Sequence, residues 1–120
     1  MSELILFDSE LKIMEILWQE GDLKAKDVSL IAFERYEWNK NTTYTILKKL
    51  IKKEAVLRKE PNFICVPLIS KEQVQIKEAK RLVDKLYEGS SQLLVSKFIE
   101  DEQLTKEELK SLRNIIDKKL

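Results

Sequence analysis

Hydrophobic residues recur at helical spacing through most of the chain, so the pattern predicts a mainly α-helical protein. The first apolar face consists of Leu11, Met14, Leu17 and Trp18. Asp8 or Ser9 is a favourable residue to cap the start of this helix, and Gly21 is placed to end it. A second short helix is expected over residues 24–36, with a buried stripe of Val28, Ile31 and Ala32.

A third helix, expected from an N-cap at Asn39 to about Lys53, has two faces of opposite character. Its inner face, with Ile51 at the edge, is predicted to consist of Thr43, Ile46, Leu47 and Leu50. Its outer face is predicted to consist of Asn41, Thr42, Thr45, Lys48, Lys49 and Lys52. This outer face carries only hydroxyls, an amide and ammonium groups.

Two short β-rich runs follow, at residues 56–59 and 63–66, and Pro61 with Asn62 marks a turn between them. They predict a small hairpin directly after the basic helix. Pro67 is expected either to end the second strand or to place that strand at a sheet edge. The single cysteine, Cys65, is expected to pack as a small apolar residue.

From Ser70 onward, the sequence predicts three more helices, and Ser70 and Thr105 each open a capping-box motif. Their apolar faces have no other globular partner in so short a chain, and a second copy of the chain is the simplest way to bury them. The alternative is that these helices fold back onto the N-terminal part. We therefore expect one domain over residues 1–69, made of three helices and the hairpin, and a helical dimerisation domain over residues 70–120. The residues expected in the dimer interface are Leu82, Leu86, Leu94, Phe98, Ile99, Leu109, Leu112 and Ile116.

Composition narrows the functional classes. The 120 residues include no His, one Cys, two Gly and two Pro. The commonest general base and metal ligand is therefore missing, and neither an internal disulfide nor a Cys-rich zinc site can form. No apolar run approaches the roughly 20 residues of a membrane span, and the N-terminus does not resemble a secretory signal. We expect a cytoplasmic protein that is not an enzyme, needs no cofactor or metal, and makes no direct membrane contact.

The net charge of +1 conceals a marked asymmetry along the chain. Residues 1–37 hold four Lys and Arg against nine Asp and Glu, whereas residues 38–60 hold seven against two. A basic island of this kind is typical of a surface that faces phosphates, although lysines can also simply solvate a helix. Three helices followed by a hairpin, with the basic face on the third helix, is the order of a winged helix-turn-helix. In that fold the third helix enters the major groove of DNA. We therefore expect residues 1–69 to form a winged-helix DNA-binding domain.

Two segments carry a resemblance to a known family. Residues 8–18 read DSELKIMEILW and residues 38–50 read WNKNTTYTILKKL. Together they resemble the BlaI/MecI penicillinase-repressor family, and the similarity extends over nearly the whole chain. The resemblance implies a winged-helix domain that binds a pseudo-palindromic double-stranded operator, as a homodimer held together by C-terminal helices. It also implies inactivation through cleavage signalled by a transmembrane β-lactam sensor-protease.

The resemblance places Thr42, Thr45 and Lys49 at the family's DNA-reading positions, with Asn41 beside them. Lys49 stands where the family usually has Arg. Lysine keeps the positive charge but lacks the bidentate guanidinium that favours guanine. The complete expected set is Asn41, Thr42, Thr45, Lys48, Lys49, Lys52, Arg58 and Lys59. The family's scissile bond corresponds to Lys97–Phe98 in this chain. The alternative hypothesis is a winged-helix protein whose lysine face binds DNA without sequence preference or binds a protein partner.

Overall fold

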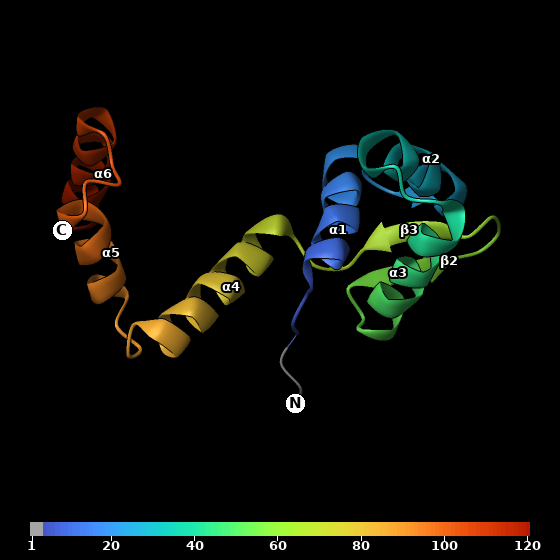
Figure 1. Ribbon diagram of the computed structural model, residues 1–120, viewed down its shortest axis with the longest axis horizontal. Helices are drawn as coiled ribbons and strands as arrows, with labels where there is room; N and C mark the ends of the chain where they lie inside the picture. The colour runs from blue at the N-terminus through green and yellow to red at the C-terminus, as the bar shows by residue number, and fades with distance from the viewer. Residues whose placement is uncertain (1–3) are drawn as a thin grey trace. The chain divides into compact units, whose positions relative to one another are not determined.

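The structure, a computed structural model, describes residues 4–120 and contains helices and one small antiparallel sheet (Figure 1). The elements are α1 (Asp8–Glu20), β1 (Leu23–Lys24), α2 (Ala25–Tyr36), α3 (Lys40–Lys52), β2 (Val56–Lys59), β3 (Ile64–Pro67), α4 (Lys71–Leu86), α5 (Ser91–Glu100) and α6 (Lys106–Lys119). The chain divides into two compact units, Met1–Val74 and Gln75–Leu120, which are described separately. The predicted class, a mainly helical chain with a small β-hairpin after the third helix, is confirmed.

The N-cap of helix α1 lies one residue before the first expected cap, Asp8. Phe7 is the N-cap residue, and its N–H donates a hydrogen bond of 2.8 Å to the Glu10 carboxylate. The prediction of Asp8 or Ser9 as the cap was wrong. The Glu10 side chain instead reaches back to the backbone N–H of Phe7, which starts the helix one residue earlier. Gly21 ends the helix as predicted, with φ of 82°, a left-handed value that glycine adopts without a steric cost.

The N-terminal unit has a closed hydrophobic core to which α1, α2, α3 and the sheet all contribute. Its largest fully buried apolar side chains are Ile13, Met14, Ile16, Leu17, Val28, Leu47, Leu50, Val56 and Cys65. Burial of one such aliphatic side chain contributes about 1.5–3 kcal/mol to folding. The predicted stripe of α2 is buried at Val28 and Ala32, while Ile31 is only half-buried against the core.

The sheet has the strand order β1-β3-β2, and both pairings are antiparallel. The predicted hairpin is present, although β3 begins at Ile64, one residue later than expected. Strand β1 was not predicted, since two residues are too few to carry an alternating pattern. Strand β1 pairs only with Ile64 and Cys65 of β3. Pro67, the last residue of β3, lies beyond this pairing, so its lack of an N–H costs no hydrogen bond to β1.

Cys65 lies in the central strand and is fully buried. Burial raises the pKa of its thiol to about 11, and this outweighs the opposing effect of the nearby Arg58 charge. The expectation that Cys65 packs as a small apolar residue is confirmed.

The chain that leaves the sheet is attached to α1. The indole N–H of Trp18 donates to the carbonyl of Ile69 at 2.9 Å, and Lys71 forms an ion pair with Glu15 at 2.8 Å. Val74, in the first turn of α4, packs into the core of the N-terminal unit. The beginning of α4 therefore belongs structurally to the N-terminal unit.

The C-terminal helices start where the sequence predicts caps. Ser70 and Gln73 exchange hydrogen bonds between side chain and backbone, as do Thr105 and Glu108. Both predicted capping boxes are therefore confirmed, and Ser90 caps α5 with its hydroxyl. Each reciprocal pair satisfies amide groups that have no partner within the first turn of a helix.

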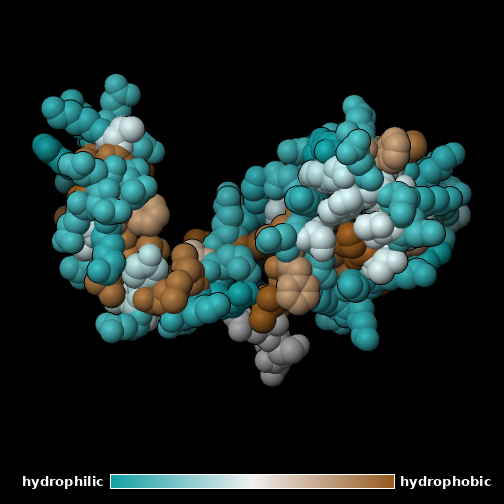
Figure 2. Space-filling view, in the orientation of Figure 1, coloured by the Kyte–Doolittle hydropathy of each residue, from teal (hydrophilic) through white to brown (hydrophobic). Residues whose placement is uncertain are grey.

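The unit Gln75–Leu120 exposes its apolar side chains instead of enclosing them. Val83 is the one apolar residue of this unit that is buried in the described chain. Hydrophobic side chains gather over α5 and the C-terminal turns of α4 in Figure 2. The large exposed ones are Ile76, Leu82, Leu86, Val95, Phe98, Ile99, Leu112, Ile115, Ile116 and Leu120. None of the helices in residues 4–120 has both the length and the apolar character required to cross a membrane.

Candidate nucleic-acid interface

Helix α3 is fixed by its cap and by its inner face. The side chain of Asn39 accepts a hydrogen bond of 2.8 Å from the N–H of Thr42, as the sequence predicts for an N-cap. The predicted inner residues, all of them buried, are Thr43, Ile46, Leu47 and Leu50. These contacts leave the opposite face of α3 directed away from the core.

That opposite face holds the predicted DNA-contacting residues of the helix. Thr42, beside the capped first turn, is half-buried. The exposed members are Asn41, Thr45, Lys48, Lys49 and Lys52. The helix carries no acidic residue in its first turn and has two lysines, Lys49 and Lys52, in its last turn. This surface combines short polar groups, which can reach base edges, with ammonium groups suited to phosphates.

The two basic residues predicted on the hairpin are both exposed, but Arg58 already has partners. Its Nε forms an ion pair with the Glu60 carboxylate, and its guanidinium lies 3.8 Å from the ring centroid of Phe63. The hydrogen bond from Arg58 lowers the pKa of Glu60, and a hydrogen bond from the Phe63 N–H lowers it further. Lys59 extends from the same strand without such an ion pair in the described residues.

Aromatic residues connect the hairpin to α3, a role that sequence reasoning missed. The ring of Tyr44 meets that of Phe63 edge-on, with centroids 5.8 Å apart. The Lys40 ammonium lies 5.6 Å from the Tyr44 centroid. Tyr44 stands between the two predicted faces of α3, and its aromatic type together with Phe63 is the signal that could have suggested this contact.

The segment before α3 is also held by aromatic packing. Tyr36 and Trp38 lie 5.0 Å apart, centroid to centroid. Lys12 of α1 places its ammonium 5.1 Å from the Tyr36 ring and 5.7 Å from the Trp38 ring. The start of α3 is thereby attached to α1 as well as to the end of α2.

The profile of the penicillinase repressor family matches residues 6–118, nearly the whole chain. The chain belongs to this family. The resemblance inferred from the two sequence segments is thereby confirmed. Within residues 4–120, no group of three or more His, Cys, Asp or Glu side chains is arranged to hold a metal ion.

Individual relatives of the penicillinase repressor family cover the chain almost end to end. The methicillin resistance regulatory protein MecI of Staphylococcus aureus strain N315 is 30% identical over 113 residues, which are 92% of each protein. A penicillinase repressor of Bacillus licheniformis is 26% identical, over 92% of this chain and 88% of that protein.

Among solved structures, the DNA-binding domain of the repressor BlaI in solution is similar to the N-terminal part. The TM-score is 0.55 at 25% sequence identity, with 61% of this chain and 93% of that domain covered. The predicted winged-helix fold is therefore confirmed.

The residues expected in a dimer interface lie on the C-terminal helices with their apolar surface accessible. Leu94 and Leu109 are half-buried. The exposed members of the set are Leu82, Leu86, Phe98, Ile99, Leu112 and Ile116. The expected scissile bond, Lys97–Phe98, lies inside α5, where the Lys97 carbonyl accepts a hydrogen bond of 2.9 Å from the Asp101 N–H.

Proposed function

We propose that this protein is a dimeric, operator-binding transcriptional repressor of genes of the β-lactam-resistance type. The observation that carries the proposal is α3, a helix with a buried inner face and a mostly exposed outer face of hydroxyl, amide and ammonium groups. Membership of the penicillinase repressor family supports it. As a DNA-binding regulator the protein acts in the cytoplasm.

In the proposed complex, α3 lies in the major groove and the hairpin β2–β3 lies beside the backbone. Lys48, Lys49 and Lys52 neutralise phosphates, which supplies affinity for any duplex and makes that affinity salt-dependent. Asn41 and Thr45 contact base edges and thymine methyl groups, which supplies the preference for one sequence. Thr42, half-buried at the start of α3, can reach base edges or phosphate oxygens. Arg58 and Lys59 add backbone contacts from the wing.

The proposed homodimer is formed through the C-terminal helices. Leu86 is 64% exposed and Ile116 54% exposed, and side chains of this size are seldom left in water together on a stable helical surface. A second copy offers an identical apolar face, which a two-fold axis can bring into register. The same axis gives two α3 helices for the two halves of a pseudo-palindromic operator.

We further propose that induction proceeds by cleavage near Lys97–Phe98 by a transmembrane β-lactam sensor-protease or a protease it activates. This bond is helical, so α5 has to unwind locally before a protease can hold it in an extended form. Cleavage there removes Phe98 and the whole of α6 from the proposed interface, while residues 4–74 keep their own core. The operator is then released because two weakly binding protomers replace one bivalent dimer.

Titration of the purified chain with DNA tests the proposal. Genomic fragments enriched on the protein identify the operator, and its affinity is compared with that of random duplex at equal salt. A repressor prefers its operator by at least about 10³-fold. Equal affinity for all duplexes would favour a non-specific DNA-binding module, and absence of DNA binding would favour a protein partner for the lysine face.

A fragment of residues 1–97 tests the cleavage step. We expect it to be mainly monomeric in sedimentation and to bind the operator at least about tenfold more weakly than the full chain at equal salt. Equal affinities would exclude loss of bivalency as the mechanism of induction, whichever protease acts.

A further inference from the structure

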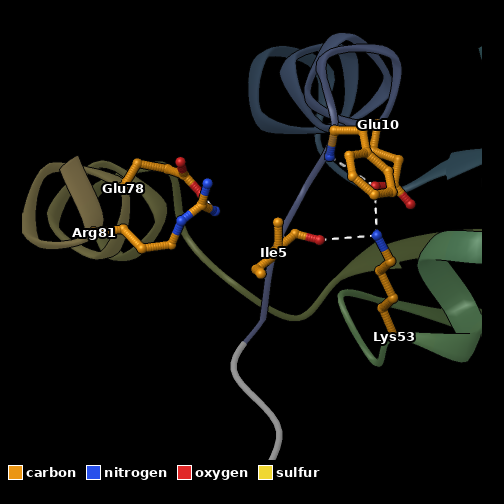
Figure 3. Close-up of polar contacts among 6 residues, drawn as sticks. Ile5, Glu10, Lys53, Glu78 and Arg81 are labelled. Atoms are coloured by element: carbon orange, nitrogen blue, oxygen red, sulfur yellow. Dashed lines mark hydrogen bonds and ion pairs between the residues drawn. The ribbon is translucent and has the colours of Figure 1, made fainter. Parts of the chain in front are cut away.

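One lysine of the basic island does not face outward with the others. Lys53 directly follows α3, and only 28% of its side chain is exposed. Its ammonium donates hydrogen bonds to a carboxylate oxygen of Glu10 at 2.6 Å and to the carbonyl of Ile5 at 2.8 Å (Figure 3). It also lies 4.4 Å from the ring centroid of Phe7. Lys53 therefore contacts Glu10 in the first turn of α1 and two residues just before that helix, all 43 or more positions away in the sequence.

The carboxylate that receives Lys53 is buried. Glu10 is 1% exposed, and the oxygen that accepts from Lys53 also accepts from the N–H of Phe7. Its other oxygen is buried and accepts no hydrogen bond from the residues that the structure describes. A buried carboxylate is strongly destabilising without a compensating cation, and within residues 4–120 Lys53 is the residue that forms an ion pair with it.

Lys53 stands at the junction between α3 and the wing. Its own N–H donates to the Lys49 carbonyl at 3.0 Å, and the N–H of Ala55 donates to the Leu50 carbonyl at 3.0 Å. Ala55 is buried and directly precedes β2, and its carbonyl accepts from the N–H of Leu68. A side chain that ties Lys53 to α1 thus fixes the end of α3 and the start of the hairpin together.

We propose that Lys53 is a positioning residue for DNA reading, which holds the C-terminal end of α3 and the start of the wing in register with α1. The inference rests on the proposed function and assigns to Glu10, Ile5 and Phe7 an indirect part in recognition. It also separates Lys53 from Lys48, Lys49 and Lys52, the proposed phosphate ligands. An ammonium committed to a buried carboxylate and a backbone carbonyl has little capacity left for a phosphate.

The test compares Lys53→Met with a matched control, Lys52→Met, in the full chain. Affinities for the operator and for random duplex are measured over a range of salt concentrations. We expect Lys52→Met to reduce the salt slope by about 0.9, since one phosphate contact is lost, and to leave the operator preference unchanged. We expect Lys53→Met to keep the slope and to reduce the operator preference about tenfold, because misplaced side chains no longer match the base edges.

Two further variants separate positioning from stability. Glu10→Gln removes the other half of the pair and should reproduce the effect of Lys53→Met, while Lys53→Arg should restore most of the preference. All binding is measured at a temperature where circular dichroism shows each variant fully folded. A loss of thermal stability with unchanged operator preference would reduce Lys53 to a structural role. A lower salt slope for Lys53→Met would make it a phosphate ligand, and either result would overturn the proposal.

Hydrogen exchange without DNA distinguishes failure of this inference from failure of the proposed function. The amides of Phe7, Lys53 and Ala55 should exchange faster in Lys53→Met than in the native chain, and Lys52→Met should leave them unchanged. If the native chain prefers no duplex, the proposed function fails while these amides still report whether Lys53 fixes the junction. Unchanged exchange in Lys53→Met would overturn the positioning role itself.

Discussion

The two units of the chain use amphipathic helices in different ways. In the unit Met1–Val74, apolar side chains such as Leu17 and Leu47 are fully buried against one another. In the unit Gln75–Leu120, Leu86 and Ile116 remain more than half exposed, and the buried Val83 is an exception among the described residues. The first unit therefore encloses its own core, whereas the second leaves its apolar surface open, as the proposed dimer requires. Short helices gain most of their stability from packing, so the proposed dimer would stabilise the second unit by burying this surface.

Disrupting the open surface should have the largest effect. Phe98→Ala combined with Leu112→Ala removes two large side chains from the proposed interface, each worth about 2–5 kcal/mol if buried there. We expect sedimentation to show monomers at micromolar concentration and operator affinity to fall by about 10²–10⁴. A double variant that remains dimeric would place the interface elsewhere.

A substitution in the closed core should act differently. Leu47→Ala should lower the free energy of unfolding by about 2–5 kcal/mol, by leaving a cavity behind α3. The loss should be the same at every protein concentration, since Leu47 lies inside a single protomer. The loss caused by Phe98→Ala should instead vary with protein concentration, because Phe98 lies in the proposed interface between protomers. Chemical denaturation at two protein concentrations separates the two cases.

Changes on the reading face should alter DNA binding with little effect on either unit's stability. Thr45→Ala is expected to reduce operator preference by about 1–3 kcal/mol, because a proposed contact with a base edge is lost. The fold should keep its stability, because Thr45 is exposed and contributes nothing to the core. Lys52→Ala should weaken all duplexes about equally and reduce the salt slope by about 0.9. If salt titrations show neither variant affecting DNA binding, α3 is not the reading element.

The smallest expected effects come from the two capping boxes, whose matched substitutions compare the stability of the two units. Ser70→Ala and Thr105→Ala each remove one side-chain acceptor from the start of a helix, at a cost of about 1 kcal/mol. The Ser70 variant should lose thermal stability at any protein concentration. The Thr105 variant should lose more when the protein is dilute, since α6 lies in the unit that we propose to be stabilised by dimerisation. Equal losses at all concentrations would contradict this division.

Local patterns in the sequence predicted much of the fold and the outline of the site. The two faces of α3 could be read from residue spacing, because Thr43 and Leu50 alternate with Lys48 and Lys49 at the period of a helix. The caps at Asn39, Ser70 and Thr105 were predictable since their motifs act over three residues.

Contacts over long sequence separations could not be predicted in this way. Strand β1 forms because Leu23 pairs with Cys65 of β3, and a strand of two residues is too short to be predicted from its own sequence. The inward turn of Lys53 depends on Glu10, and by composition alone Lys53 is one more lysine in a basic island. A shorter separation in sequence was still enough to conceal the Tyr44–Phe63 contact.

The bond from Trp18 to the Ile69 carbonyl has a mechanical consequence. With the Lys71–Glu15 ion pair, it ties the exit of the N-terminal unit to α1, which precedes in sequence the helix α3 that carries the proposed reading face. Tension transmitted along α4 is therefore borne first by α1 and its anchors. The proposed reading face on α3 takes no part in these two anchors, so a force on α4 reaches it only through the core of the N-terminal unit.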